Sequence, residues 1–416
     1  MPVTPQPSAL TLLRRGEFRA FVLALVLAAS AESALSVLLG VTVYQLTRDP
    51  LALAWLGLIE AAPAIALVLI GGHVADRLPR RRVVVACRLA MAALTAGVAL
   101  AAALAEGDFL PILYTLAFCI GIVRAFKDPA YSGLEAQVVP AALAVQAASL
   151  LGSTGRAFRL AAPVAGGFLY DAAGPAATYA TIAALLAASA LVLLVFLPHR
   201  PVVTSHAETG GMVANIGDGL RYVFRNQILV GSMALDLFAV FFGGMMGLLP
   251  MFGDMLGVGA QGVGIMRAAL SAGGLTAMAV AIRYPPRERA GIALLIAVAG
   301  FGVAVIGFGL STSFHLSVAL LFIMGACDGV SMVVRHAIVR LAAPEGMRGR
   351  IAAVRMVFLN SANELGDFES GVAAHLVGPA LAVAGGGAIT LAVVVVTALV
   401  APKLRRLNLL ELKPGA

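Results

Sequence analysis

Long apolar runs separated by short polar connections make up almost the whole chain. A helix needs roughly 20 apolar residues to cross a bilayer, and we read twelve runs of about that length. They cover residues 18–46, 51–75, 83–105, 109–138, 144–172, 175–197, 226–252, 258–282, 290–311, 314–342, 350–378 and 382–402. The pattern predicts an all-α integral membrane protein with twelve transmembrane helices.

The longest polar stretch divides these spans into two sets of six. It holds Glu208, Gly210 and Gly211 and shows no hydrophobic period, which favours a flexible connection over a folded insertion. We therefore predict an N-terminal six-helix half at 1–198, a cytoplasmic central linker at 199–219, and a C-terminal six-helix half with a cytoplasmic tail at 220–416. Across the junction of the linker and this half, the pattern of residues 218–227 predicts a short helix at the membrane interface.

Basic residues gather on one side of the predicted topology. If the odd-to-even connections lie outside, the outside loops hold Arg48 as their clear cation. The inside segments hold Arg14, Arg15, Arg77, Arg80, Arg81, Arg82, Arg200, Arg283, Arg287, Arg289, Arg348, Arg350, Lys403, Arg405 and Arg406. Because cytoplasmic loops are rich in Lys and Arg, both termini are predicted to be cytoplasmic.

Composition supports a membrane protein and excludes several other classes. The chain is 61% hydrophobic and 12% charged, against roughly 25% charged for a soluble domain, so a lipid bilayer must solvate it. The net charge of +8 follows from the loop bias, and the basic residues lack the interleaved aromatic residues of a nucleic-acid platform. We expect no nucleic-acid partner. The three cysteines lie in apolar runs without ligand spacing, which predicts neither disulfides nor a metal site.

The two halves of the sequence repeat one another. Adding 204 to the numbering places Gly40 on Gly244, Pro140 on Pro344 and Gly167 on Gly371, and around spans 2 and 8 the offset becomes 207. Several matches in order at one offset indicate a duplicated six-span unit. The fold prediction thus becomes two pseudo-symmetric six-helix halves.

The repeat also orders the charges that lie inside predicted spans. An ionisable group there costs roughly 2.5–3.5 kcal/mol, so it normally faces protein or a water-filled cavity. Two pairs of repeat equivalents stand out, on spans 1, 4, 7 and 10: Glu32 with Asp236, and Arg124 with Asp328. The functional interpretation is that Glu32 or Asp236 binds a proton, with Arg124 as the cation near Glu32. The structural interpretation is a static ion pair.

Span 11 carries a second polar group, formed by Asn363, Glu364, Asp367 and Glu369. The three acids could relay protons, recognise a cationic or polyhydroxy substrate, or pair structurally with Arg267 and Arg355. They could also lie in water, if the boundary of the span is misplaced.

The connection between spans 2 and 3 resembles a known motif. In Gly72–Arg82 the order of residues is similar to G-x-x-x-D-R-x-G-R-R/K, the loop between helices 2 and 3 of the major facilitator superfamily. Pro79 replaces the inner glycine, and the matching residues are Gly72, Asp76, Arg77, Arg80 and Arg81. The resemblance implies a cytoplasmic gate loop at these residues and a central cavity lined by helices 1, 4, 7 and 10.

Span 5 resembles the antiporter signature G-P-x-x-G-G of the same superfamily. Pro163, Gly166 and Gly167 match this helix-bend signature, whereas Ala162 replaces its first glycine, which weakens an inference of antiport. The Tyr44–Thr47 ending of span 1 and the Arg348-Gly349-Arg350 turn resemble the branch that holds macrolide-type and enterobactin-type exporters.

These resemblances imply a secondary transporter that works by alternating access. We expect a functional monomer in a bacterial plasma membrane that exports a small organic molecule, a siderophore or a drug-like compound, in exchange for protons. The proton gradient would be its energy source, with no cofactor. The alternative is proton-linked uptake of a metabolite. A scaffold or an enzyme is a third reading, but the sequence has no catalytic constellation, and no phosphate-cradling loop for an ATP-driven exporter.

Overall fold

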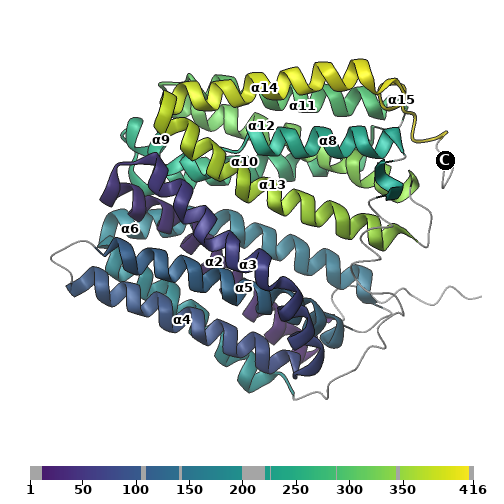
Figure 1. The fold of residues 1–416 in the computed structure, drawn as a ribbon. Coiled ribbons are helices and arrows are strands. Elements are labelled where there is room, and N and C mark those ends of the chain that lie inside the picture. The colour runs from purple at the N-terminus through teal and green to yellow at the C-terminus, as the bar shows by residue number, and fades with distance from the viewer. Residues whose placement is uncertain are drawn as a thin grey trace, which may run out of the picture. The chain divides into compact units, whose positions relative to one another are not determined.

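The computed structural model describes residues 12–104, 109–139, 143–198, 221–224, 226–286, 288–342 and 347–411. These ranges are helical and hold no strand (Figure 1). The long helices are α2 (Gly16–Thr47), α3 (Pro50–Arg77), α4 (Arg80–Leu104), α5 (Leu110–Val138), α6 (Ala144–Phe196), α8 (Gln227–Phe242), α10 (Gly259–Arg283), α11 (Ala290–Gly309), α12 (Phe314–Ala342), α13 (Arg348–Val377) and α14 (Pro379–Val400).

These helices confirm the predicted all-α membrane fold. Ten helical segments of the described residues are long and apolar enough to cross a membrane. One of them, Gln146–Phe196, is long enough for the two predicted spans 5 and 6. The polar helix α13 is not among the ten, because its acids, amides and arginines lower its hydropathy, although it has the 30-residue length of a span.

The repeat is visible in the backbone where spans 5 and 6 meet. Gly174 interrupts α6 with φ 80° and ψ 175°, and Pro175 follows it. At an offset of 204, Gly378 separates α13 from α14 with φ 87° and ψ 155°, and Pro379 follows. Only glycine adopts these torsions readily, and proline is well suited to the first turn of the helix that follows. The sequence analysis did not identify this pair.

Span 7 departs from the prediction of one helix over 226–252. Helix α8 ends at Phe242, and the chain continues through η2 (Met246–Leu248) into the short α9 (Leu249–Met255). The break falls at Gly243 and Gly244. Groups from α13 contact the interrupted backbone: the Gly247 N–H donates to Asp367 Oδ1 (3.3 Å), and the Ser370 hydroxyl donates to the Gly244 carbonyl. An interrupted helix is tolerated at membrane depth where such partners are present.

Two compact units are formed by the chain. Unit 1 comprises residues 1–48, 56–206 and 259–264, and unit 2 comprises residues 49–55, 207–258 and 265–416. In unit 1, α4 packs against α5 and α6, and α2 packs against α6. In unit 2, α11 packs against α12 and α14, and α8 packs against α13 and α14. The predicted linker 199–219 lies outside the described residues. Of the predicted interfacial helix, residues 221–224 are helical.

The first turns of α3 and α10 make repeat-related contacts. In unit 1, Asp171 accepts hydrogen bonds from the N–H groups of Ala260 (3.1 Å) and Gln261 (2.8 Å) at the start of α10. In unit 2, the equivalent of Asp171 is His375, whose Nδ1 lies 3.0 Å from Asp49 Oδ1 beside the start of α3. Asp49 Oδ1 also accepts from the Leu51 N–H (2.9 Å). A carboxylate thus caps both helix starts, Asp171 for α10 and Asp49 for α3.

Candidate functional site

Glu32 lies in α2 and forms an ion pair with Lys127 of α5. Lys127 Nζ is 2.8 Å from Glu32 Oε2 and 3.5 Å from Asp128 Oδ1. The Lys127 side chain is 10% exposed and that of Glu32 is 28% exposed. Sequence analysis expected Arg124 beside Glu32. Arg124 instead pairs with Glu60 of α3 at 2.6 Å, because it lies three residues, nearly one turn, before Lys127 on α5.

A second cation, Arg88 of α4, interacts electrostatically with Glu32. It is 2% exposed. Its Nη1 donates to the Ser189 hydroxyl (2.7 Å), and its guanidinium lies 5.7 Å from the ring centroid of Tyr131. The sequence analysis missed Arg88 and Lys127. The signal available for both was an unneutralised cation deep inside an apolar run.

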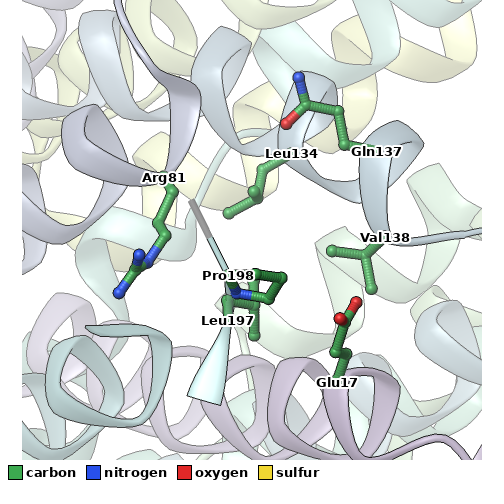
Figure 2. Close-up of a pocket in the computed structure, with 7 residues that line it drawn as sticks. All are labelled: Glu17, Arg81, Leu134, Gln137, Val138, Leu197 and Pro198. Carbon is green, nitrogen blue, oxygen red and sulfur yellow. The ribbon is translucent and has the colours of Figure 1, made fainter. Parts of the chain in front are cut away.

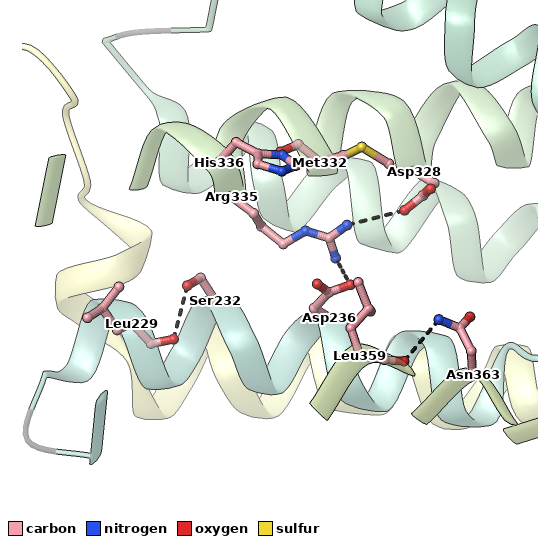
Figure 3. Close-up of polar contacts among 9 residues, drawn as sticks. All are labelled: Leu229, Ser232, Asp236, Asp328, Met332, Arg335, His336, Leu359 and Asn363. Carbon is pink, nitrogen blue, oxygen red and sulfur yellow. Dashed lines mark hydrogen bonds and ion pairs between the residues drawn. The ribbon is translucent and has the colours of Figure 1, made fainter. Parts of the chain in front are cut away.

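Asp236, the repeat equivalent of Glu32, lies in α8 and is paired with a cation from α12. Arg335 Nη1 donates to Asp236 Oδ1, and Arg335 Nη2 donates to Asp328 Oδ1 at 3.3 Å. Figure 3 shows the guanidinium between the two carboxylates. Asp236 is 3% and Arg335 5% exposed, whereas the Asp328 side chain is 43% exposed. Arg335 lies seven residues, or about two turns, after Asp328 on α12.

The polar residues of α13 separate into different environments. Asp367 contacts the broken span 7 and interacts electrostatically with Arg267. Glu369 lies 3.5 Å from the Ser370 hydroxyl, and Asn363 donates to the carbonyl of Leu359 (2.9 Å) on its own helix. The side chains of Glu364 and Arg355 lie outside the described residues. Asp367 therefore has a structural contact, whatever further role the group has.

The predicted gate loop makes contacts within unit 1. Asp76 is exposed and lies 3.7 Å from Arg80, whose Nη1 donates to the Gly133 carbonyl of α5 (3.1 Å). Arg81 donates to the Leu193 carbonyl (2.9 Å) and to that of Leu194, near the end of α6. A cation is favourable beside carbonyls at a helix C-terminus. Arg77 is exposed at the end of α3.

Arg81 also lines a small pocket at the ends of α5 and α6, which Figure 2 shows. Its other lining residues are Glu17, Leu134, Gln137, Val138, Leu197 and Pro198. The pocket combines one carboxylate and one guanidinium with apolar side chains. It lies beside the gate loop rather than beside Glu32.

The two glycines before the gate loop differ in their surroundings. A Cβ on Gly71 would overlap the Ala125 carbonyl of α5, whereas a Cβ on Gly72 would meet nothing within 4 Å. The close approach of α3 to α5 therefore depends on Gly71. Gly72 instead matches the loop motif without a packing role.

The signature residues of span 5 pack at helix crossings. A Cβ on Gly166 would lie 3.1 Å from Ala34 Cβ of α2, and one on Gly167 would overlap the Ala260 carbonyl of α10. Pro163 lies inside α6, but the non-helical torsions of that helix fall at Gly174. Gly166 and Gly167 thus permit close packing, and their role as a bend with Pro163 stays a prediction.

The sequence of the chain resembles those of known proteins. The family model described as Major Facilitator Superfamily matches residues 21–366. Among curated proteins, the chain is similar to the enterobactin exporter EntS of Shigella boydii, Shigella flexneri and Escherichia coli. Each of these is 25% identical over 286 residues, which are 68% of this chain and 67% of the relative.

Solved structures agree with the fold. The chain is similar to the nucleoside transporter NupG (TM-score 0.65, 15% identity, 94% of this chain and 98% of that one). It is similar to a D-xylose–proton symporter (TM-score 0.68, 14% identity, 96% of this chain and 100% of that one). It is also similar to a bacterial homologue of the human lysosomal transporter Spinster (TM-score 0.67, 15% identity, 96% of this chain and 97% of that one). At these identities the likeness concerns the fold alone.

Proposed function

The chain belongs to the major facilitator superfamily, and from this premise we propose that it is a proton-coupled exporter of a small organic molecule. Members of the family are transporters rather than enzymes, and this chain is a multi-pass membrane protein. We further infer that it works as a monomer in a bacterial plasma membrane, with both termini in the cytoplasm and the proton gradient as its energy source.

The observation that supports proton coupling is that Asp236 and Asp328 share the guanidinium of Arg335. These three side chains sum to −1 when both acids are ionised and to zero when one of them is protonated. Ionised groups inside a membrane span are costly. A carboxylate that shares its cation with another acid is therefore a group that a proton can neutralise reversibly, which is the property that a proton carrier needs.

Asp328 is the better candidate for the acid that releases and takes up the proton. Its side chain is 43% exposed, whereas that of Asp236 is 5% exposed and receives the closer contact from Arg335. Other titratable or charged groups on the same helices are His336, whose Nδ1 lies 2.8 Å from the Met332 carbonyl oxygen, and Arg340 near the end of α12. An exposed carboxyl can exchange protons with water directly, whereas Asp236 is buried against the guanidinium of Arg335.

Outward transport is supported by the curated relatives and by the sequence. The EntS proteins are enterobactin exporters, and the match extends over two thirds of the chain. The Arg348-Gly349-Arg350 turn favours the same branch. At 25% identity, cargo is inferred only as a class, a siderophore or a drug-like compound.

Uptake of a metabolite is the second candidate. Ala162 interrupts the antiporter signature of span 5, and a D-xylose–proton symporter has the same fold. Direction must therefore be measured.

Inside-out membrane vesicles separate the two functions. Enterobactin and the macrolide erythromycin serve as probes, and respiration acidifies the vesicle lumen. An exporter that exchanges cargo for protons accumulates a probe in the lumen, and nigericin, which collapses the pH gradient, abolishes the accumulation. Vesicles that lack the protein are the control. Three results would contradict the proposal. They are accumulation that persists without the gradient, transport of neither probe, and gradient-driven accumulation in right-side-out vesicles alone.

The gate loop is proposed to hold the cytoplasmic end in one state of the transport cycle. Asp76→Asn removes the charge that faces Arg80 while keeping its size. We expect transport to fall with little change in the unfolding temperature, because Asp76 is exposed and surface pairs contribute about 0–1 kcal/mol. Normal transport by this variant would remove Asp76 from the gate. Glu288→Gln, in the equivalent connection of the second half, is the matched control.

A further inference from the structure

The Glu32 cluster of unit 1 carries the opposite charge balance to the triad of unit 2. Glu32 and Asp128 are its carboxylates, and Arg88, Lys127 and Arg159 are the cations near them. The arithmetic is three positive charges against two negative ones, hence +1. Glu135 interacts electrostatically with Tyr131, but it is not among the charges that act on Glu32 or on Arg88.

The surplus cation is buried rather than solvated. Arg88 is 2% and Lys127 8% exposed, whereas the Asp128 side chain is 63% exposed and screened by water. Counting only the buried groups, Arg88 and Lys127 face the single carboxylate of Glu32. Burying an uncompensated charge costs several kcal/mol, so this arrangement favours the arrival of a second anion.

Two polar groups of the cluster also lack hydrogen-bond partners. Within the described part of the chain, Arg88 Nε and the Tyr131 hydroxyl are buried and unpartnered. Both can donate to an acceptor. Arg88 itself is held in place, because Ser189 accepts from it and donates in turn to the Ala24 carbonyl (2.6 Å). The Arg88 guanidinium is therefore held in place by Ser189, and its Nε–H is available to donate to a further acceptor.

The second half shows that the fold does not require this cation. With the offset of 207 that aligns Pro79 with Pro286, Arg88 corresponds to Leu295, which is 8% exposed. With the offset of 204, Lys127 corresponds to Ser331. The same six-helix plan thus packs with an apolar residue and a hydroxyl where unit 1 has Arg88 and Lys127.

We propose that the Glu32–Lys127–Arg88 cluster binds an anionic group of the cargo, a carboxylate or an acidic phenol. In the absence of cargo the Glu32 carboxylate occupies the place of that anion on Lys127. When cargo binds, its anion takes over Lys127, and Glu32 moves toward the exposed Arg159, with which it already interacts electrostatically. This inference rests on the proposed transport function and adds the charge class of the cargo.

Equilibrium binding to the purified full-length chain tests the proposal without a proton gradient. Salicylate and salicylamide are the probes, because they share a hydroxylated ring and differ in a carboxylate against an amide. Calorimetry should give salicylate at least tenfold tighter binding than salicylamide. Equal affinities, or no binding of salicylate, would overturn the anion site.

Variants locate the site. Lys127→Met should weaken salicylate binding at least tenfold, whereas Glu32→Gln, which removes the competing internal anion, should strengthen it several-fold. The double variant removes both charges of the Glu32–Lys127 pair, so neither is left without the other. It guards against a folding defect of the single variants and should bind as weakly as Lys127→Met. Lys403→Met, which removes a distant cation, should change nothing. Weaker binding by Glu32→Gln, or unchanged binding by Lys127→Met, contradicts the proposal.

The outcome is independent of the coupling mechanism. If vesicles show no gradient-driven transport but salicylate binds as expected, the anion site stands and the exporter proposal fails. If transport is driven by the gradient but the two probes bind equally, the exporter proposal stands and the anion site fails.

Discussion

At the scale of single residues, each carboxylate proposed from the sequence to bind a proton is paired with a cation from another helix, Glu32 with Lys127 and Asp236 with Arg335. Glu32 and Asp236 could be identified because their positions repeat and because charges in apolar runs are conspicuous. Their cations could not, because an ion pair between two helices depends on rotation and crossing angle, which periodicity does not fix. The difference between Arg124 and Lys127 is three residues on one helix, yet only Lys127 contacts Glu32.

Removing one partner of the buried pair in unit 2 should destabilise the protein. Arg335→Met removes the guanidinium that contacts Asp236, which is 3% exposed, and breaking a buried ion pair from one side costs about 3–5 kcal/mol in the free energy of unfolding. Thermal unfolding in detergent measures the change. Adding Asp236→Asn should restore most of the lost stability, because the carboxylate that lost its guanidinium is then replaced by a neutral amide. A stable single variant, or a double variant no more stable than the single, would show that the pair is not coupled.

At the scale of elements, hydropathy placed nearly every helix within a few residues of its observed bounds. It failed at span 7, where three glycines and backbone contacts from α13 break the helix. Average hydropathy does not register such a break, since glycine is neither strongly polar nor strongly apolar. The Gly174-Pro175 and Gly378-Pro379 breaks were not identified from the sequence, although a signal for them was present. The Gly-Pro pair marks a helix end and recurs at the repeat offset.

Two neighbouring glycines give a matched test of helix packing. Gly71→Ala would drive a methyl group into the Ala125 carbonyl and should lower the free energy of unfolding by about 1–3 kcal/mol or more. Gly72→Ala adds the same methyl group to open space and should be neutral or slightly stabilising, since alanine favours helix. Unfolding midpoints in detergent compare the two. Equal midpoints would contradict the close approach of α3 to α5.

At the scale of the whole molecule, duplication has produced two units with one plan and opposite charge balances. The first helix of each half presents a carboxylate to a cation on the fourth, Glu32 to Lys127 and Asp236 to Arg335. Around these pairs, unit 1 has surplus cations and unit 2 a surplus carboxylate. The sequence predicted the family, the fold and the repeat. It could not predict the balances, which depend on which distant charges the fold brings together.

The most direct test of the account is the behaviour of Asp328→Asn in inside-out vesicles. The substitution fixes the triad in its neutral form, so it should abolish accumulation of cargo driven by the pH gradient. Exchange of labelled for unlabelled cargo without a gradient needs no net proton movement and should persist. We therefore expect Asp328→Asn to lose gradient-driven accumulation and to keep exchange. Gradient-driven accumulation by Asp328→Asn at the rate of the unaltered protein would contradict it, as would the loss of both activities.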